Sequence, residues 1–199
     1  SDDNMRLQEE FVSYLVERAL ERCSEELQVL ERETSKLEGI CPPFPRVSYT
    51  EALEILKGKG SNTEWGVDLG ATDEAALMED RDLPLFVYNY PKGAKAFYMK
   101  ENPDDSNTVL CNDLLAPEGY GEIIGGSQRE DDLDRLMARI REEDLPEQAY
   151  AWYLDLRRYG SFPHSGFGLG LERTVAWITG RHHIREMIPF PRLMNRLYP

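Results

Sequence analysis

The sequence predicts an α+β fold in which an antiparallel sheet is flanked by helices. Two observations support this prediction. The middle of the chain holds short apolar segments separated by short turns, which is typical of antiparallel strand pairing. On either side, apolar residues recur at three- and four-residue intervals, which indicates amphipathic helices. Together these patterns predict a single layered domain.

The composition fits a soluble globular protein. The 199 residues are enough for one domain with a sizeable core, and the 41% hydrophobic and 30% charged contents are ordinary. No apolar run approaches the ~20 residues of a membrane span, so no membrane partner is expected. The net charge of −14 argues against a surface built mainly to hold nucleic acid. Three widely spaced cysteines indicate neither disulfides nor a zinc site, and favour a reducing, cytoplasmic setting.

Residues 4–38 are predicted to form one long amphipathic helix that packs on the domain. A free coiled coil is the less favoured alternative, because the repeat departs from strict heptads. Pro42 and Pro43 end the unit. The predicted apolar stripe consists of Leu7, Phe11, Leu15, Ala19, Cys23, Leu27 and Leu30.

A short extended piece and two short helices are expected next. Residues 47–49 read as extended. Thr50 is the expected N-cap of a helix over 50–57, and Thr72 of a helix over 72–79, because threonine favours that position.

The central segment is rich in predicted strands. Apolar and β-branched residues predict strands over 83–90, 96–100, 108–115 and 122–125, with a turn at 103–107.

The last third is predicted to be mainly helical. Helices are expected over 129–143 and 146–158, and a third over 172–179 ends at Gly180. Prolines mark residues 189–191 as the start of an irregular tail.

Glycine alternates with large apolar residues at 166–171, just before the last predicted helix. On a strand, Phe167, Leu169 and Leu171 face one side and the glycines face the other. Three glycines weaken a strand, so the bare face needs a reason. One reason is the close approach of a flat ligand such as a nucleobase with its ribose; the other is close packing of a helix on the sheet. The residues alone leave both open, but they do not form the GxGxxG pattern of a Rossmann fold.

Arg173 follows the glycine stretch at the start of the predicted helix. From there a guanidinium can reach the mouth of a pocket floored by the glycines, and its planar fork suits phosphate oxygens. The alternative is an ordinary surface arginine. Because a positive charge in the first turn opposes the helix dipole, this placement favours a functional role.

A second polar group surrounds the predicted strand at 122–125. A carboxylate such as Glu122 beside a nucleotide pocket can hold Mg²⁺ while the ion also binds phosphates. Asp113 can supply a second oxygen ligand from the preceding strand. The alternative is that Glu122 and Arg129 pair with each other or with solvent.

The histidines and serines do not form a recognisable catalytic pattern. His164 has no partner at metal-ligand spacing, and the side chains of the adjacent His182 and His183 point in different directions. Ser127 and Ser165 lie outside any GxSxG elbow.

With these residues in view, the chain resembles the class II aminoacyl-tRNA synthetases. Residues 166–173 are similar to motif 3 of that family. Because Asp131 stands where aspartyl enzymes usually carry a histidine, the asparaginyl branch is favoured, and residues 125–130 are similar to it. Further similarities to the aspartyl and asparaginyl subgroup lie at 65–69, 89–91, 95–99, 155–160, 163–165 and 188–192.

The resemblance implies roles for individual residues. Arg173 corresponds to the catalytic arginine that holds the γ-phosphate of ATP. Glu122 corresponds to the Mg²⁺-binding catalytic glutamate, with Asp113 as its acidic partner; the loop between these two varies in length, which makes Asp113 the weaker assignment. Arg129 corresponds to the arginine that recognises the side-chain carbonyl of the amino acid. Gly168 and Gly170 correspond to the floor under the adenosine.

The resemblance also implies an activity. A synthetase of this branch ligates asparagine to tRNA(Asn) through an asparaginyl-adenylate, uses ATP and Mg²⁺, and forms a homodimer. Two alternatives remain open: a synthetase-like paralogue that makes asparagine from aspartate, and a non-catalytic binding module.

Several parts of the family pattern are not found in the sequence. The chain lacks an initiating Met, the anticodon-binding OB-fold, motif 1 of the dimer interface and the motif 2 arginine for the α-phosphate. The segment at 4–38 is similar to the part that follows motif 2. We therefore expect residues 1–199 to be the C-terminal part of a catalytic domain, inactive in isolation, with tRNA held mainly by upstream regions.

Overall fold

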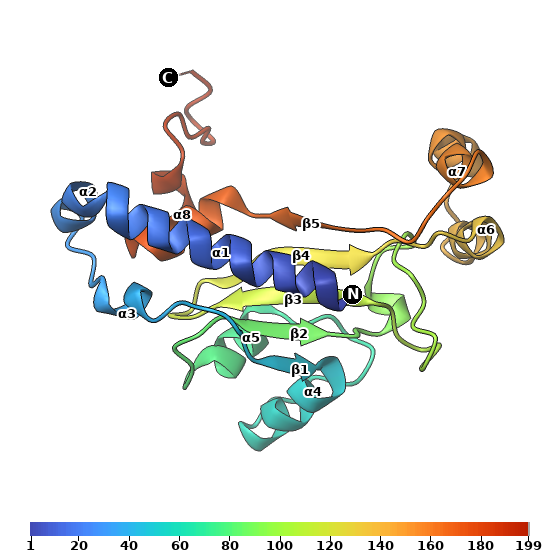
Figure 1. Cartoon of the computed structure of the whole chain (residues 1–199), viewed down its shortest axis with the longest axis horizontal. Coiled ribbons are helices and arrows are strands. Elements are labelled where there is room, and N and C mark those ends of the chain that lie inside the picture. The colour runs from blue at the N-terminus through green and yellow to red at the C-terminus, as the bar shows by residue number, and fades with distance from the viewer. Residues whose placement is uncertain (199) are drawn as a thin grey trace.

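The computed structural model describes residues 1–198, and its centre is a five-stranded sheet in the order β1-β2-β3-β4-β5 (Figure 1). The strands are β1 Arg46–Ser48, β2 Leu85–Tyr88, β3 Cys111–Ala116, β4 Gly121–Gln128 and β5 Ser165–Leu169. All neighbours pair antiparallel except β1 and β2, which are parallel. The predicted α+β class with a mainly antiparallel sheet is confirmed.

Helices flank this sheet on both faces. Helix α1 runs across one face beside β4 and β5, whereas α4 packs near β1 and β2, and α5 near β3 and β4 (Figure 1). Helices α6 and α7 pack together at the end of the sheet remote from α2. The helices are α1 Asp2–Arg22, α2 Ser24–Val29, α3 Ser35–Glu38, α4 Tyr49–Gly58, α5 Ala71–Met78, α6 Leu133–Glu142, α7 Ala151–Arg158 and α8 Leu171–Thr179, with 3₁₀ turns at Lys92–Ala94, Glu147–Tyr150 and Ile184–Met187.

Strand alternation divides the apolar side chains between two cores. In β2, Phe86 faces the core under α1, whereas Leu85 and Val87 face the core under α4 and α5. Successive side chains of a strand point to opposite faces, so a sheet covered on both sides needs apolar residues at nearly every position. This explains why the central strands read as continuous apolar runs.

The single long helix predicted over 4–38 is wrong. Cys23 leaves helical geometry with φ −120° and ψ 28°, and Glu31 has φ 55° after α2. The predicted apolar stripe is wrong over α1, where Leu7 is 56% exposed and the buried residues include Met5 and Val12. Leu27 of the stripe is buried, in α2. The buried face of α1 carries polar residues that find partners on the sheet, so a search for apolar periodicity selects a different face.

Two helices begin earlier than predicted. Ser48 rather than Thr50 caps α4, because its side chain accepts from the Glu51 N–H while the Glu51 carboxylate accepts from the Ser48 N–H. Helix α5 begins after Gly70 instead of Thr72. The N-cap at Ser48 has a sequence signature, since Ser48 and Glu51 have the spacing of a capping box.

The predicted strand over 96–100 is also wrong. This segment contains a turn in which the Met99 N–H donates to the Ala96 carbonyl over 3.1 Å, and only isolated bridges connect it to the sheet region. The other predicted strands exist with shifted ends, and β4 extends well beyond 122–125. The turn over 103–107 is confirmed, with Thr108 donating to Asp105.

The helical prediction for the last third is largely confirmed. Helix α6 begins at Leu133, after its N-cap Asp132, rather than at 129. The helix predicted over 146–158 begins with a 3₁₀ turn before α7. Gly180 has φ 72° and ends α8 as predicted. No helix within residues 1–198 has the length and apolar content of a membrane span.

Candidate functional site

The candidate site lies on the sheet face opposite α1, over β3, β4 and β5. The register pairs Asp113 with Gly125, and Gly125 with Gly168, so these residues form one row across the three strands. Helices α4 and α5 cover the neighbouring part of this face. Because glycine has no side chain, nothing projects from Gly125 or Gly168 beside the Asp113 carboxylate.

The glycine stretch largely matches its prediction. Phe167 and Leu169 pack into the core under α1, and the Phe167 ring lies 6.2 Å from that of Phe11. A Cβ built on Gly168 meets no atom within 4 Å, so its face is open instead of covered by a helix. The prediction for Leu171 is wrong, because this residue begins α8 and is 65% exposed. The open face favours the ligand interpretation of the glycines over the packing interpretation.

Arg173 lies in the first turn of α8, as the sequence predicts. Its Nη1 donates to the main-chain carbonyl of Glu122 over 2.8 Å, while the side chain remains exposed. The helix is placed by Gly170, whose N–H donates to the Ile123 carbonyl over 2.8 Å. Gly170 therefore belongs to the junction between β5 and α8 instead of to the strand.

The two predicted carboxylates converge over Gly125. A Cβ on Gly125 would lie 2.8 Å from Glu122 Oε1 and 3.6 Å from Asp113 Oδ1. Burial raises the pKa of Glu122, and the nearby charges of Asp113 and Glu74 raise it further. A bound cation would relieve the electrostatic cost of keeping these neighbouring carboxylates ionised.

Lys95 offsets part of this negative charge. Its Nζ lies 2.8 Å from Asp113 Oδ2 and 3.1 Å from Asp68 Oδ1, with the Tyr90 ring centroid at 4.0 Å. Burial lowers the pKa of Lys95, but the two carboxylates outweigh this effect and hold it above its ordinary value. One oxygen of Asp113 is thus occupied by the ammonium, and the other faces Gly125.

Arg129 lies near the far end of β4 from Glu122, roughly 20 Å away at strand spacing. Its guanidinium contacts the Ser127 hydroxyl, passes 3.2 Å from the Cβ position of Gly166, and stacks 4.9 Å from the Tyr98 ring centroid. The alternative of a Glu122–Arg129 pair is not seen among the described residues. Arg129 instead presents its donors beside Gly166, near the start of β5.

The sequence did not identify two residues of the site, Glu74 and Lys95. Glu74 on α5 accepts from the main-chain N–H of Glu122 over 3.0 Å. Both lie far from their partners along the chain, and no local spacing connects them. A cavity of about 350 Å³ is lined by Glu74, Glu122 and Arg173, among others.

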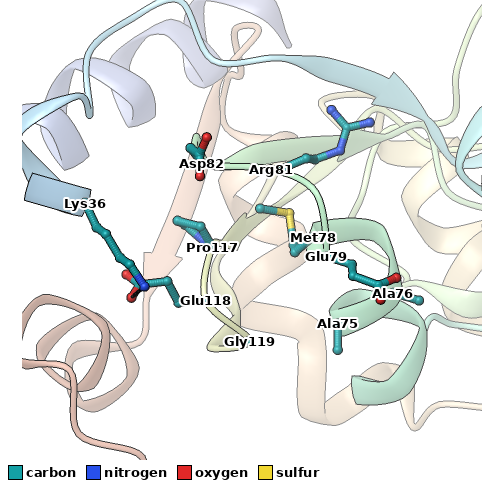
Figure 2. A pocket seen from close by; sticks show the side chains of 10 residues that line it. All are labelled: Lys36, Ala75, Ala76, Met78, Glu79, Arg81, Asp82, Pro117, Glu118 and Gly119. Atoms are coloured by element: carbon teal, nitrogen blue, oxygen red, sulfur yellow. Dashed lines mark ion pairs between the residues drawn. The ribbon is translucent and has the colours of Figure 1, made fainter.

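A second cavity, of about 630 Å³, is lined by residues of α5, by the turn between β3 and β4 and by Lys36 (Figure 2). Lys36 reaches Glu118 at its rim, with Nζ and Oε2 separated by 3.4 Å. None of the residues predicted to carry chemistry lines this cavity. The candidate site is therefore the smaller cavity and the open glycine row.

The donor set of the site suits a hard cation. Glu122 Oε1 and Asp113 Oδ1 approach the same point, and Mg²⁺ is usually held by one or two carboxylates together with substrate phosphates and waters. Within residues 1–198, no group of three or more His, Cys, Asp or Glu side chains has the arrangement of a metal site. These two carboxylates would thus provide part of a coordination shell.

Known proteins match this chain over nearly its whole length. The family model of tRNA synthetases class II (D, K and N) matches residues 1–194. The crystal structure of asparaginyl-tRNA synthetase from Pyrococcus horikoshii complexed with asparaginyl-adenylate has 58% identity and a TM-score of 0.94, and covers 98% of this chain. The asparaginyl-tRNA synthetase of Entamoeba histolytica, also in complex with asparaginyl-adenylate, has 31% identity, a TM-score of 0.90 and 100% coverage. The aspartyl tRNA synthetase of Entamoeba histolytica is less similar, with 27% identity, a TM-score of 0.86 and 100% coverage.

The chain spans less than half of each of these structures: 45% of the two asparaginyl-tRNA synthetases and 41% of the aspartyl enzyme. The matched part contains the whole five-stranded sheet and every residue of the candidate site. On the extent of the family match and the identity to these structures, the chain belongs to the class II tRNA synthetases (D, K and N).

Proposed function

We propose that this chain is the C-terminal part of the catalytic domain of an asparaginyl-tRNA synthetase. The observation that carries the proposal is the placement of Glu122, Arg129 and Arg173 around the face of β4 and β5 on which Gly166 and Gly168 lie. The asparaginyl-adenylate in the similar structures supports the choice of amino acid and of ATP. The other substrate is tRNA(Asn), and the whole enzyme acts as a cytoplasmic homodimer.

The proposed reaction has two steps. In the first, an oxygen of the asparagine carboxylate forms a bond to the α-phosphorus of ATP, the α–β phosphoanhydride bond breaks, and pyrophosphate leaves. In the second, a 3′-terminal ribose hydroxyl of the tRNA attacks the carbonyl carbon and AMP leaves. The protein mainly positions the reactants and stabilises charge.

Each residue of the site has a different role in this reaction. Arg173 holds the γ-phosphate, and its contact with the Glu122 carbonyl keeps the guanidinium at the cavity mouth. The bare face of Gly168, together with Gly170 at the start of α8, provides the floor for adenosine. Arg129 donates to the side-chain oxygen of asparagine. Glu122 and Asp113 would hold Mg²⁺, which would neutralise charge on the phosphates.

The test is asparagine-dependent ATP–pyrophosphate exchange by the full-length enzyme. We expect Arg173→Ala to lower the exchange rate by roughly 10²–10³-fold, the size found when one preorganised donor is removed. Arg22→Ala, at an exposed position on the last turn of α1, is the matched control and should leave the rate unchanged. Unchanged exchange in Arg173→Ala would contradict the role of Arg173.

The same assay tests the expectation that the 199 residues alone are nearly inactive. Robust exchange by the isolated chain would refute it. Formation of free asparagine from aspartate without tRNA charging would instead support a synthetase-like paralogue. Failure of the full-length protein to bind ATP in calorimetry would support a non-catalytic module.

A further inference from the structure

Glu122 lies on β4 beyond the point where β5 stops pairing with it. Strand β5 pairs with β4 only as far as Leu169 opposite Ile124, and the chain then turns into α8. In an antiparallel pair, opposite residues alternate between pairs that exchange both main-chain hydrogen bonds and pairs that exchange none. Glu122 is opposite Leu115 on β3 but has no residue of β5 opposite it. A main-chain N–H or carbonyl that points toward the missing strand needs another partner.

Two charged side chains supply those partners. The Glu122 N–H donates to Glu74 Oε2 over 3.0 Å, and the Glu122 carbonyl accepts from Arg173 Nη1 over 2.8 Å. An anionic acceptor and a cationic donor thus hold one residue at both of its main-chain polar groups. Hydrogen bonds with a charged partner are stronger than neutral ones.

The chain is shaped to admit Glu74 at this point. Gly121 has φ 70°, and a Cβ there would lie 2.5 Å from Glu74 Oε2. A side chain at position 121 would therefore displace the carboxylate from the Glu122 N–H. A register shift between Leu114 and Leu115 also leaves Ile123 without a partner on β3, so the ladder alone fixes this part of β4 weakly.

We propose that Glu74 is a positioning residue that holds the main chain of Glu122, and through it the carboxylate of Glu122 and the guanidinium of Arg173, in the geometry that binds Mg²⁺ and ATP. This inference rests on the proposed function. In the proposed function Arg173 also holds the γ-phosphate, whereas Glu74 contacts only the main chain of Glu122.

The location of Glu74 agrees with this role. Its side chain lines the same cavity as Glu122 and Arg173. Its substitution should therefore alter the phosphate end of the site and leave the distant Arg129 end unaffected.

The experiment measures ATP–pyrophosphate exchange in the full-length enzyme, with Mg²⁺·ATP and asparagine varied separately. We expect Glu74→Ala to raise the KM for Mg²⁺·ATP by about 10-fold or more, the equivalent of one hydrogen bond to a charged group, and to leave the KM for asparagine unchanged. Glu74→Gln keeps an acceptor for the Glu122 N–H and should restore most of the loss.

Asp73→Ala is the matched control on the same helix. Asp73 accepts from Ser61 and Thr63, each over 2.8 Å, and makes no contact with Glu122 among the described residues. Its removal should lower the Tm without changing the KM for Mg²⁺·ATP. The comparison separates loss of helix packing from loss of the main-chain contact.

Two results would overturn the inference while leaving the enzyme's function intact. One is an active Glu74→Ala enzyme with an unchanged KM for Mg²⁺·ATP. The other is an equal rise in the KM for both substrates that Asp73→Ala reproduces. A wild-type enzyme without asparagine-dependent exchange would instead overturn the proposed function itself.

Discussion

At the scale of single residues, two glycines of the same ladder have different physical reasons to be glycine. Gly168 on β5 faces open space, where an added Cβ meets nothing within 4 Å. Gly126 on β4 faces α1, where an added Cβ would lie 2.6 Å from Gln8 Nε2 and 3.1 Å from Asn112 Oδ1. The first is open to a ligand and the second is filled by a buried amide pair.

These surroundings predict opposite effects of the same substitution. Gly126→Ala should destabilise the protein by about 1–3 kcal/mol, because the buried amides have little room to move. Gly168→Ala should leave stability unchanged or slightly higher, since glycine weakens a strand by roughly 0.5–1 kcal/mol relative to alanine, and should raise the KM for ATP. Urea denaturation and exchange kinetics measure the two effects. Loss of stability in Gly168→Ala would mean that its face is not free.

At the scale of the elements, helix caps show how local sequence and packing interact. Ser48 ends β1 and caps α4 through a reciprocal contact with Glu51. Thr50, two residues later, lies inside the helix and is exposed. Both are good N-cap residues by type, and only the end of the strand decides which one stands outside the helix.

We expect Ser48→Ala to destabilise the protein by about 1 kcal/mol, because the Glu51 N–H at the start of α4 loses its acceptor. Thr50→Ala is the matched control and should change stability by less than about 0.5 kcal/mol, as is usual for exposed positions. Urea denaturation of both variants gives the comparison. Equal losses in the two variants would contradict the assigned cap.

Helix α1 shows a case in which apolar periodicity predicts the wrong buried face. Its buried face includes Gln8, which exchanges amide hydrogen bonds with Asn112 on β3. Since a paired amide can be buried without a large penalty, the core face need not be the most apolar one. Leu7 and Phe11 satisfy the helical period but lie outside the core.

At the scale of the whole molecule, one ion cluster joins segments that are far apart in the chain. Arg32, in the loop after α2, donates to both carboxylate oxygens of Glu118 in the turn between β3 and β4. Its Nε also donates to the Ile178 carbonyl near the end of α8 over 3.1 Å. The cluster therefore holds three elements together at one end of the sheet.

This cluster predicts a pH dependence of stability. Burial raises the pKa of Glu118, but the hydrogen bonds and charges of Arg32 and Lys36 outweigh it and leave the pKa below its ordinary value. A carboxyl with a lowered folded-state pKa stabilises the fold above its unfolded pKa of about 4.3, and this contribution is lost as the pH falls through the folded value.

Glu118→Gln should therefore be less stable than the wild type by about 1–3 kcal/mol at neutral pH, and the difference should shrink as the pH falls below about 4. Thermal unfolding at a series of pH values measures it. Glu33→Gln, at an exposed carboxylate 3.7 Å from Lys36, is the control and should have little effect. A difference that stays constant down to pH 3 would exclude the ion pair as its cause.

The sequence by itself determined the fold class and most elements, because short apolar runs, turn residues and helical periodicity are local patterns. The roles of Arg173, Glu122 and Arg129 follow from the resemblance to the synthetase family and stay predictions. What packs against a glycine decides whether its face is bare. What packs against α1 decides which stripe of the helix is buried. Only the tertiary structure brought Glu74 to the main chain of Glu122 and Lys95 to Asp113. The physical reason is that such contacts join different elements, and neither partner carries a local signal of the other.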